Sequence, residues 1–158
     1  MSDDQGPEVA EGVEDAAKLP DDISYVVGIG ASAGGLEALR AFFSVMPANS
    51  GMAFVVIQHL APDYKSLMVE LLARLTAMPV IRAEEGMAVR ANHVYLIPPR
   101  FNLTISGGVL HLAPPPGGKA LNLPIDIFFR SLAAAHGERA VAIVLSGTGS
   151  DGARGIRA

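Results

Sequence analysis

Three long apolar segments in this chain each lead to a different reactive side chain. Residues 25–30 lead to Ser32, residues 54–58 to His59, and residues 141–145 to Asp151. Nearly unbroken apolar runs of this length are typical of strands buried on both faces, as in a parallel sheet. Because parallel strands end at one edge, where the ligands of such sheets bind, we expect the three side chains to meet there. Serine, histidine and aspartate are the parts of a nucleophilic triad.

Strands and helices alternate along the chain. Apolar residues at helical spacing predict helices that begin near Leu36, Leu67 and Ile125, and short strands are predicted at 80–82 and 94–97. The segment 103–112 alternates in polarity around a Gly-Gly pair, which predicts a β-hairpin. The expected fold is α/β: a three-layer, doubly wound, mainly parallel (Rossmann-like) sheet with the hairpin as an insertion or an edge.

Composition limits the domain organisation. The 158 residues suffice for one domain with a sizeable core. Residues 1–22 are acidic and poor in large apolar side chains, so we expect a disordered leader before a domain at 23–158. The chain stops at Ala158, where a helix is expected to begin, so the domain is expected to be incomplete at its C-terminus.

Composition also excludes some classes of function. The chain has no cysteine, hence no disulfide and no thiolate ligand or nucleophile. No apolar stretch is long enough to enter a membrane, and the absence of a signal peptide favours the cytoplasm. A net charge of −4 and the lack of tryptophan argue against a nucleic-acid partner. We expect no cofactor and no metal.

The turn around Ser32 fits the pattern G-x-S-x-G, with Gly30 and Gly34 on either side. This pattern exposes a serine hydroxyl when it joins a strand to a helix, as predicted here. The Ala33 N–H, directly after the serine, is the first candidate for an oxyanion-hole donor, with the first turn of the helix around Gly34 beside it. The alternative is a tight turn whose serine only caps the helix.

A second pattern overlaps the first. Residues 28–33 also fit G-x-G-x-x-G/A, the fingerprint of dinucleotide-binding folds. That interpretation expects an acidic residue about 20 residues further on, at the end of the second strand. Gln58 and His59 stand there instead, which counts against NAD or FAD without deciding the question.

The histidine and the aspartate also have simpler interpretations. His59 could be a capping or loop histidine, and Asp151 could cap the helix that follows its glycine-rich turn. Asp63 competes as a partner for His59, although the turn at Pro62 favours a solvent-facing carboxylate. No two histidines lie three or four residues apart, so a metal site has little support, and no lysine completes a phosphate-binding loop.

Four segments together resemble one known family, the catalytic domain of CheB-type chemotaxis protein-glutamate methylesterases. The segments are 28–35, 56–59, 95–99 and 145–152, and the resemblance spans 25–158. It implies a Ser32-His59-Asp151 triad, with Ala33, Gly34 and Thr148 as oxyanion- or substrate-binding residues. The implied substrate is a γ-glutamyl methyl ester on the cytoplasmic part of a chemoreceptor, and certain receptor glutamines are implied as deamidation substrates.

The sequence departs from the family pattern in three ways. No receiver domain precedes residue 23, many members carry methionine where Thr148 stands, and the family domain continues for several tens of residues beyond the aspartate. Some relatives are fused to methyltransferase and sensory domains, so this chain could belong to such a protein. The alternative functions are a truncated interaction module that binds receptors without catalysis and, less favoured, a dinucleotide-binding domain.

Overall fold

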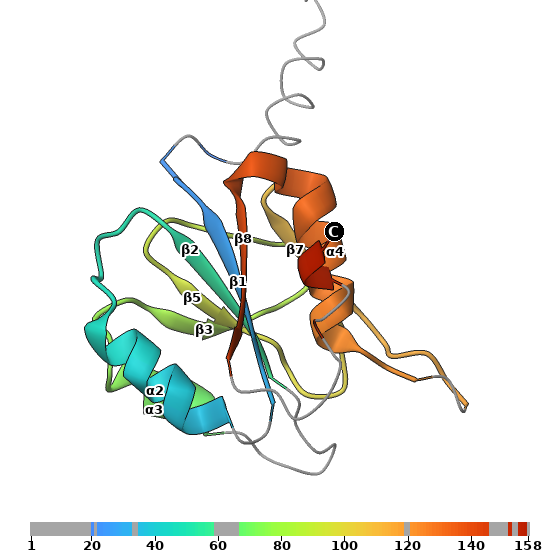
Figure 1. Ribbon diagram of the computed structural model, residues 1–158, viewed down its shortest axis with the longest axis horizontal. Coiled ribbons are helices and arrows are strands. Elements are labelled where there is room, and N and C mark those ends of the chain that lie inside the picture. Colours follow the sequence, from blue (N-terminus) through green and yellow to red (C-terminus); the bar gives the residue numbers. More distant parts are fainter. Residues whose placement is uncertain are drawn as a thin grey trace, which may run out of the picture.

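A computed structural model of the chain describes residues 20, 22–32, 35–58, 67–118, 121–145, 152 and 155–157. Apart from residues 20 and 22, the predicted leader lies outside the described residues. The remainder shows the predicted α/β architecture, with helices on both faces of a central sheet (Figure 1).

The central sheet of the described chain has five strands, all of whose pairings are parallel. Their order across the sheet is β3-β5-β2-β1-β8. The strands are β1 (Val26–Ala31), β2 (Ala53–Gln58), β3 (Val80–Arg82), β5 (Val94–Leu96) and β8 (Ala140–Leu145). The strands predicted from the apolar runs are therefore confirmed, and β1 lies between the other two strands of the expected triad.

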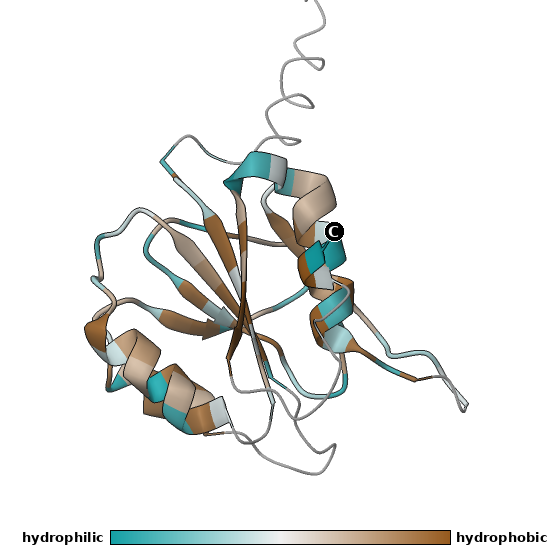
Figure 2. Ribbon diagram, in the orientation of Figure 1, coloured by the Kyte–Doolittle hydropathy of each residue, from teal (hydrophilic) through white to brown (hydrophobic). Residues whose placement is uncertain are grey.

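Burial explains why these runs are so apolar. Every residue of β1 and β2 is buried, as expected for strands covered on both faces (Figure 2). Strand β8 lies at the end of the described sheet and its residues are only partly buried, with Val144 at 39% exposure. The runs thus differ in environment, although their sequences look alike.

Two hydrophobic cores lie on opposite faces of the sheet. Helices α2 (Leu36–Val45) and α3 (Met68–Ala73) pack on one face, where Phe42, Phe43 and Phe54 meet edge to face. Helix α4 (Pro124–His136) covers the other face. The short 3-10 helix η2 (Gly137–Arg139) follows it directly. A second 3-10 helix, η3 (Gly155–Arg157), packs against α4. Buried Phe128, Phe129 and Leu132 line the sheet side of α4.

The predicted hairpin belongs to a second, antiparallel sheet rather than to an edge of the first. It comprises β6 (Asn102–Ser106) and β7 (Val109–Ala113), joined by Gly107 and Gly108 with φ of 56° and 74°. A two-residue strand, β4 (Met87–Ala88), pairs with the other side of β7 and was not predicted. Apolar side chains of the hairpin share the α4 core, and β6 contacts α4, so this small sheet supports the helix.

Candidate active site

The carboxyl ends of β1, β2 and β8 lie side by side at the lower edge of the sheet in Figure 1. Ala31, the last residue of β1, is in register with Gln58 of β2 and with Leu145 of β8. Ser32 follows Ala31 directly, and His59 follows Gln58 directly. Neighbouring strands are about 4.8 Å apart, so the serine and the histidine follow adjacent, in-register strand ends.

Ser32 itself is half-buried and begins a tight turn into α2. Its carbonyl oxygen accepts a hydrogen bond from the Gly35 N–H at 2.8 Å. The residue at the N-cap position of α2 is Gly35, not Ser32. The alternative in which Ser32 serves as the N-cap of this helix is therefore not what the structure shows, and the positive end of the α2 dipole lies three residues beyond the serine.

The other predicted site residues lie outside the described residues. These are Ala33, Gly34, His59, Thr148 and Asp151, together with the competing Asp63. The geometry of the site is therefore described from the ends of β1, β2 and β8 and from the described residues next to them.

The structure describes residues on both sides of Asp151. Strand β8 ends at Leu145 before it, and after it Gly152 and Gly155 pack against α4. Gly152 has φ of +92°, and a Cβ there would lie 2.9 Å from Cγ2 of Ile125. A side chain at Gly152 would therefore be strained twice, by backbone conformation and by contact.

Asp126 provides the polar part of this attachment. Its Oδ1 accepts a hydrogen bond from the Gly155 N–H at 2.7 Å, and both residues are buried. Asp126 lies in the first turn of α4, within the helix predicted to begin near Ile125. An aspartate in the first turn of an otherwise apolar helix face was the available signal, since a buried carboxylate needs a polar partner.

The two glycines of the overlapping dinucleotide pattern have a packing role. Gly28 and Gly30 lie inside β1, and neither has a positive φ. A Cβ at Gly30 would lie 2.5 Å from Ile125 Cγ2, and one at Gly28 would lie 3.1 Å from Leu132 and Phe128. These glycines let α4 approach β1 closely. Gly30 belongs to the strand and not to the turn, which begins only after Ala31.

With this geometry established, comparison with known proteins decides the family. The family model described as CheB methylesterase matches residues 27–158. This chain belongs to the CheB methylesterase family. The family match covers all of β1 but its first residue, all of β2 and β8, and the three residues Ser32, His59 and Asp151.

Individual relatives agree with this assignment. The chain is 39% identical over 137 residues to protein-glutamate methylesterase/protein-glutamine glutaminase 3 of Burkholderia thailandensis, covering 84% of this chain and 38% of the relative. It is 55% identical over 91 residues to an uncharacterized 104.1 kDa protein of Rhodobacter capsulatus, covering 58% of this chain and 10% of that protein. The chain thus spans well under half the length of these relatives.

A solved structure shows the same fold. The catalytic domain of Thermotoga maritima CheB methylesterase superimposes with a TM-score of 0.74 at 27% sequence identity. The match covers 85% of this chain and 75% of the Thermotoga chain. The doubly wound, mainly parallel architecture is therefore that of the CheB catalytic domain.

The segment 95–99, one of the four that resemble CheB, begins in the core. Tyr95 is 1% exposed, and its hydroxyl accepts a hydrogen bond from the Arg90 N–H at 2.8 Å. Burial raises the pKa of Tyr95 above its ordinary value, against the opposing effects of the Arg90 N–H and charge. Tyr95 thus fixes the chain between β4 and β5 rather than acting at the carboxyl edge.

A small hollow opens at the carboxyl ends of β2, β3 and β5. Gln58, Arg82 and Pro99 line it, with apolar side chains from α3, β2 and β5 around them. Gln58 is 8% exposed, and its Oε1 has no hydrogen-bond partner among the described residues. The hollow therefore presents an amide oxygen and a guanidinium within an apolar surround, next to the strand end that leads to His59.

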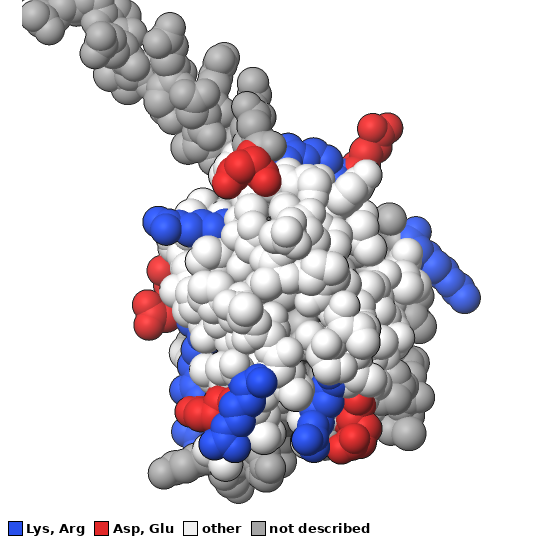
Figure 3. All heavy atoms as spheres, turned by 90° about the vertical axis from the view of Figure 1, so that its left-hand side faces the viewer, with Lys and Arg blue, Asp and Glu red and all other residues white. Residues whose placement is uncertain are grey.

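The described surface shows no broad patch of one charge on the face seen in Figure 3. Lysine and arginine side chains there are interspersed with acidic ones, mostly around the rim. Among the described residues, no three histidine, aspartate or glutamate side chains are grouped to hold a metal ion. None of the described helices is long and apolar enough to cross a bilayer.

Proposed function

We propose that this chain is the catalytic part of a protein-glutamate methylesterase that hydrolyses γ-glutamyl methyl esters on a chemoreceptor. The nucleophile is Ser32, the general base is His59, and Asp151 orients the imidazole. Deamidation of receptor glutamines is a second reaction of the same site, as the names of the relatives state for those proteins.

One observation supports this proposal above the others. Ser32 follows the central strand β1, whose two hydrogen-bonded neighbours are the strands that lead to His59 and to Asp151. A triad assembled from three separate strand ends needs them to be adjacent and parallel, and they are. Family membership adds that proteins with this fold carry names that state this reaction.

The mechanism follows from the roles of the three side chains. Ser32 Oγ attacks the ester carbonyl carbon, and its proton passes to His59. The N–H groups of Ala33 and Gly34 stabilise the resulting oxyanion, at roughly 3–4 kcal/mol for each well-placed donor. His59 returns the proton to the departing methoxide as methanol. Water, activated by His59, then releases the glutamate side chain and restores Ser32.

The substrate is the cytoplasmic domain of a methylated chemoreceptor, so the protein acts in the cytoplasm during chemotaxis adaptation or related signalling. Thr148 borders the ester site, where its smaller, polar side chain replaces the methionine of many relatives and changes the fit. Fusion to methyltransferase and sensory domains is consistent with the relative of 104.1 kDa, of which this chain matches 10%.

Methanol release from a methylated receptor fragment tests the proposal. Ser32→Ala is expected to lower the rate at least about 1000-fold, because removing a triad serine leaves only binding and oxyanion stabilisation. Ser44→Ala is the matched control, since Ser44 is exposed on α2 and its Oγ donates only to the Ala41 carbonyl oxygen within the described chain. Wild-type methanol release by Ser32→Ala would exclude Ser32 as the nucleophile.

A further inference from the structure

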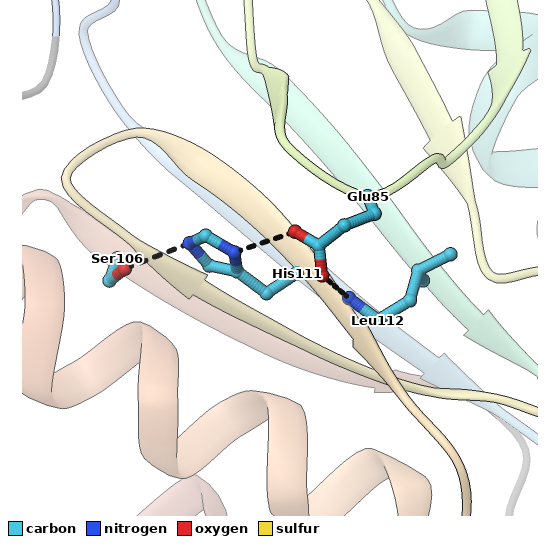
Figure 4. Close-up of polar contacts among 4 residues, drawn as sticks. All are labelled: Glu85, Ser106, His111 and Leu112. Carbon is cyan, nitrogen blue, oxygen red and sulfur yellow. Dashed lines mark hydrogen bonds and ion pairs between the residues drawn. The ribbon is translucent and has the colours of Figure 1, made fainter.

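A second serine, histidine and carboxylate lie in line at the antiparallel sheet, which is separate from the central sheet (Figure 4). Ser106 Oγ is 3.2 Å from His111 Nε2, and His111 Nδ1 is 2.9 Å from Glu85 Oε2. Ser106 ends β6, His111 lies in β7, and Glu85 lies in the turn before β4. No sequence pattern connects the three residues, because they meet only when β6 and β7 pair.

The carboxylate is held by two hydrogen bonds. Glu85 Oε1 accepts from the Leu112 N–H at 3.1 Å, while Oε2 faces the imidazole. The hydrogen bond with His111, followed by that from Leu112, lowers the pKa of Glu85 below its ordinary value. Glu85 is therefore ionised at neutral pH and can only accept hydrogen bonds.

The tautomer of His111 follows from this. Since the carboxylate cannot donate, His111 Nδ1 carries the proton that it shares with Glu85. In the neutral imidazole, Nε2 then has a free electron pair, so the hydroxyl of Ser106 must be the donor in the 3.2 Å contact. This is the direction of proton sharing that activates a serine nucleophile.

The site is open to solvent. Ser106 is exposed, and the side chains of His111 and Glu85 are 43% and 59% exposed. Gly107 and Gly108 form the two-residue turn that follows the serine, and the N–H groups of such a turn lie outside the strand ladder. Small molecules can thus reach the hydroxyl, with the N–H groups of the turn close by in sequence.

We propose that Ser106, His111 and Glu85 form a second nucleophilic site, at which Ser106 is acylated by small activated esters such as aryl acetates. Ser106 Oγ bonds to the acyl carbon, the bond from that carbon to the aryl oxygen breaks, and the serine proton moves to His111 Nε2. The aryl oxide leaves with the electron pair of the broken bond, and the imidazolium then releases its proton to water. Hydrolysis of the acyl-serine returns the hydroxyl and a carboxylic acid.

Peptide mapping after exposure to p-nitrophenyl acetate tests this site. The protein carries Ser32→Ala, so that the proposed methylesterase site cannot contribute, and the reaction is stopped with acid before tryptic digestion. Cleavage after Arg100 and Lys119 gives a peptide in which Ser106 is the only serine. We expect Ser106 to be acetylated about 100-fold faster than Ser44, an exposed serine whose Oγ donates to a backbone carbonyl oxygen.

Variants of His111 and Glu85 test whether these two side chains cause the reactivity of Ser106. His111→Gln is expected to reduce the rate at Ser106 to that at Ser44, and Glu85→Gln to reduce it by at least about tenfold. Urea unfolding of the protein that keeps His111 and Glu85 is also expected to make the acetylation rates of Ser106 and Ser44 equal. This test does not depend on the folding of a His111 or Glu85 variant. Equal rates at Ser106 and Ser44 in the folded protein, or a preference that survives His111→Gln, would overturn the proposal.

Discussion

The carboxylate of Asp126 accepts a hydrogen bond from the backbone N–H of Gly155 at 2.7 Å, joining the first turn of α4 to the segment that follows Asp151. The adjacent Ile125 contacts the positions of both Gly30 and Gly152, so one turn of helix packs against β1 and against the chain after the aspartate. We therefore predict that Asp126 is a positioning residue for the proposed triad, acting through the Gly155 backbone rather than on the substrate.

We expect Asp126→Ala to lower kcat for methanol release by about 10- to 100-fold, with a smaller change in KM. The substitution leaves the buried Gly155 N–H without its acceptor, which lowers the stability of the fold by about 1–3 kcal/mol. We expect this loss to make the position of Asp151 less defined. Asp126→Asn keeps an acceptor oxygen and should restore most of kcat. Exposed Glu138 provides the control, and equal effects of Glu138→Ala and Asp126→Ala would contradict the positioning role.

Gly30→Ala is expected to destabilise the protein by about 1–3 kcal/mol, because the new methyl group would lie 2.5 Å from Ile125 Cγ2 in a packed core. Urea unfolding measures the free energy. Gly117→Ala is the control, since a Cβ at Gly117 meets nothing within 4 Å. Adding Ile125→Ala to Gly30→Ala should cost less than the sum of the two single changes, and strict additivity would rule out this contact as the cause.

Asp151→Asn is expected to lower kcat by about 10⁴-fold, as removal of the orienting carboxylate does in other serine hydrolases. Asp63→Asn should leave methanol release within a factor of two. Both rates come from the same assay on the methylated receptor fragment. The reverse order of effects would show that Asp63, and not Asp151, orients His59.

His136 makes the stability of the fold depend on pH. Burial first, and the charge of Arg139 second, lower its pKa in the folded protein below the ordinary value. Its Nε2 is buried without a hydrogen-bond partner among the described residues. The unfolded chain therefore takes up a proton near pH 6.5 while the folded chain does not, so this contribution favours folding above that pH and is lost as the pH falls.

Urea unfolding at pH 7.5 and at pH 5.5 measures this effect. The wild-type chain should lose more stability between the two values than His136→Gln does, because glutamine does not titrate. Identical losses in the two proteins would assign the pH dependence to other groups.

Much of the fold was predictable because its strands are unusually apolar. Runs 54–58 and 141–145 became β2 and β8 with boundaries shifted by one residue, since the alternation of buried strands and amphipathic helices is a local signal. The placement of the hairpin in a separate sheet was not predictable. A two-residue strand, β4, completes that sheet, and no sequence pattern distinguishes so short a strand from a loop.

The sequence by itself determined the α/β class, the family and the residue types at the ends of three strands, because these depend on local periodicity and on motifs. Only the tertiary structure decided which strands are neighbours, that Asp126 holds the chain after Asp151, and that Ser106, His111 and Glu85 lie in line. The physical reason is that strand register and helix packing bring together residues far apart along the chain, such as Glu85 with His111 and Asp126 with Gly155, and no local pattern encodes that meeting.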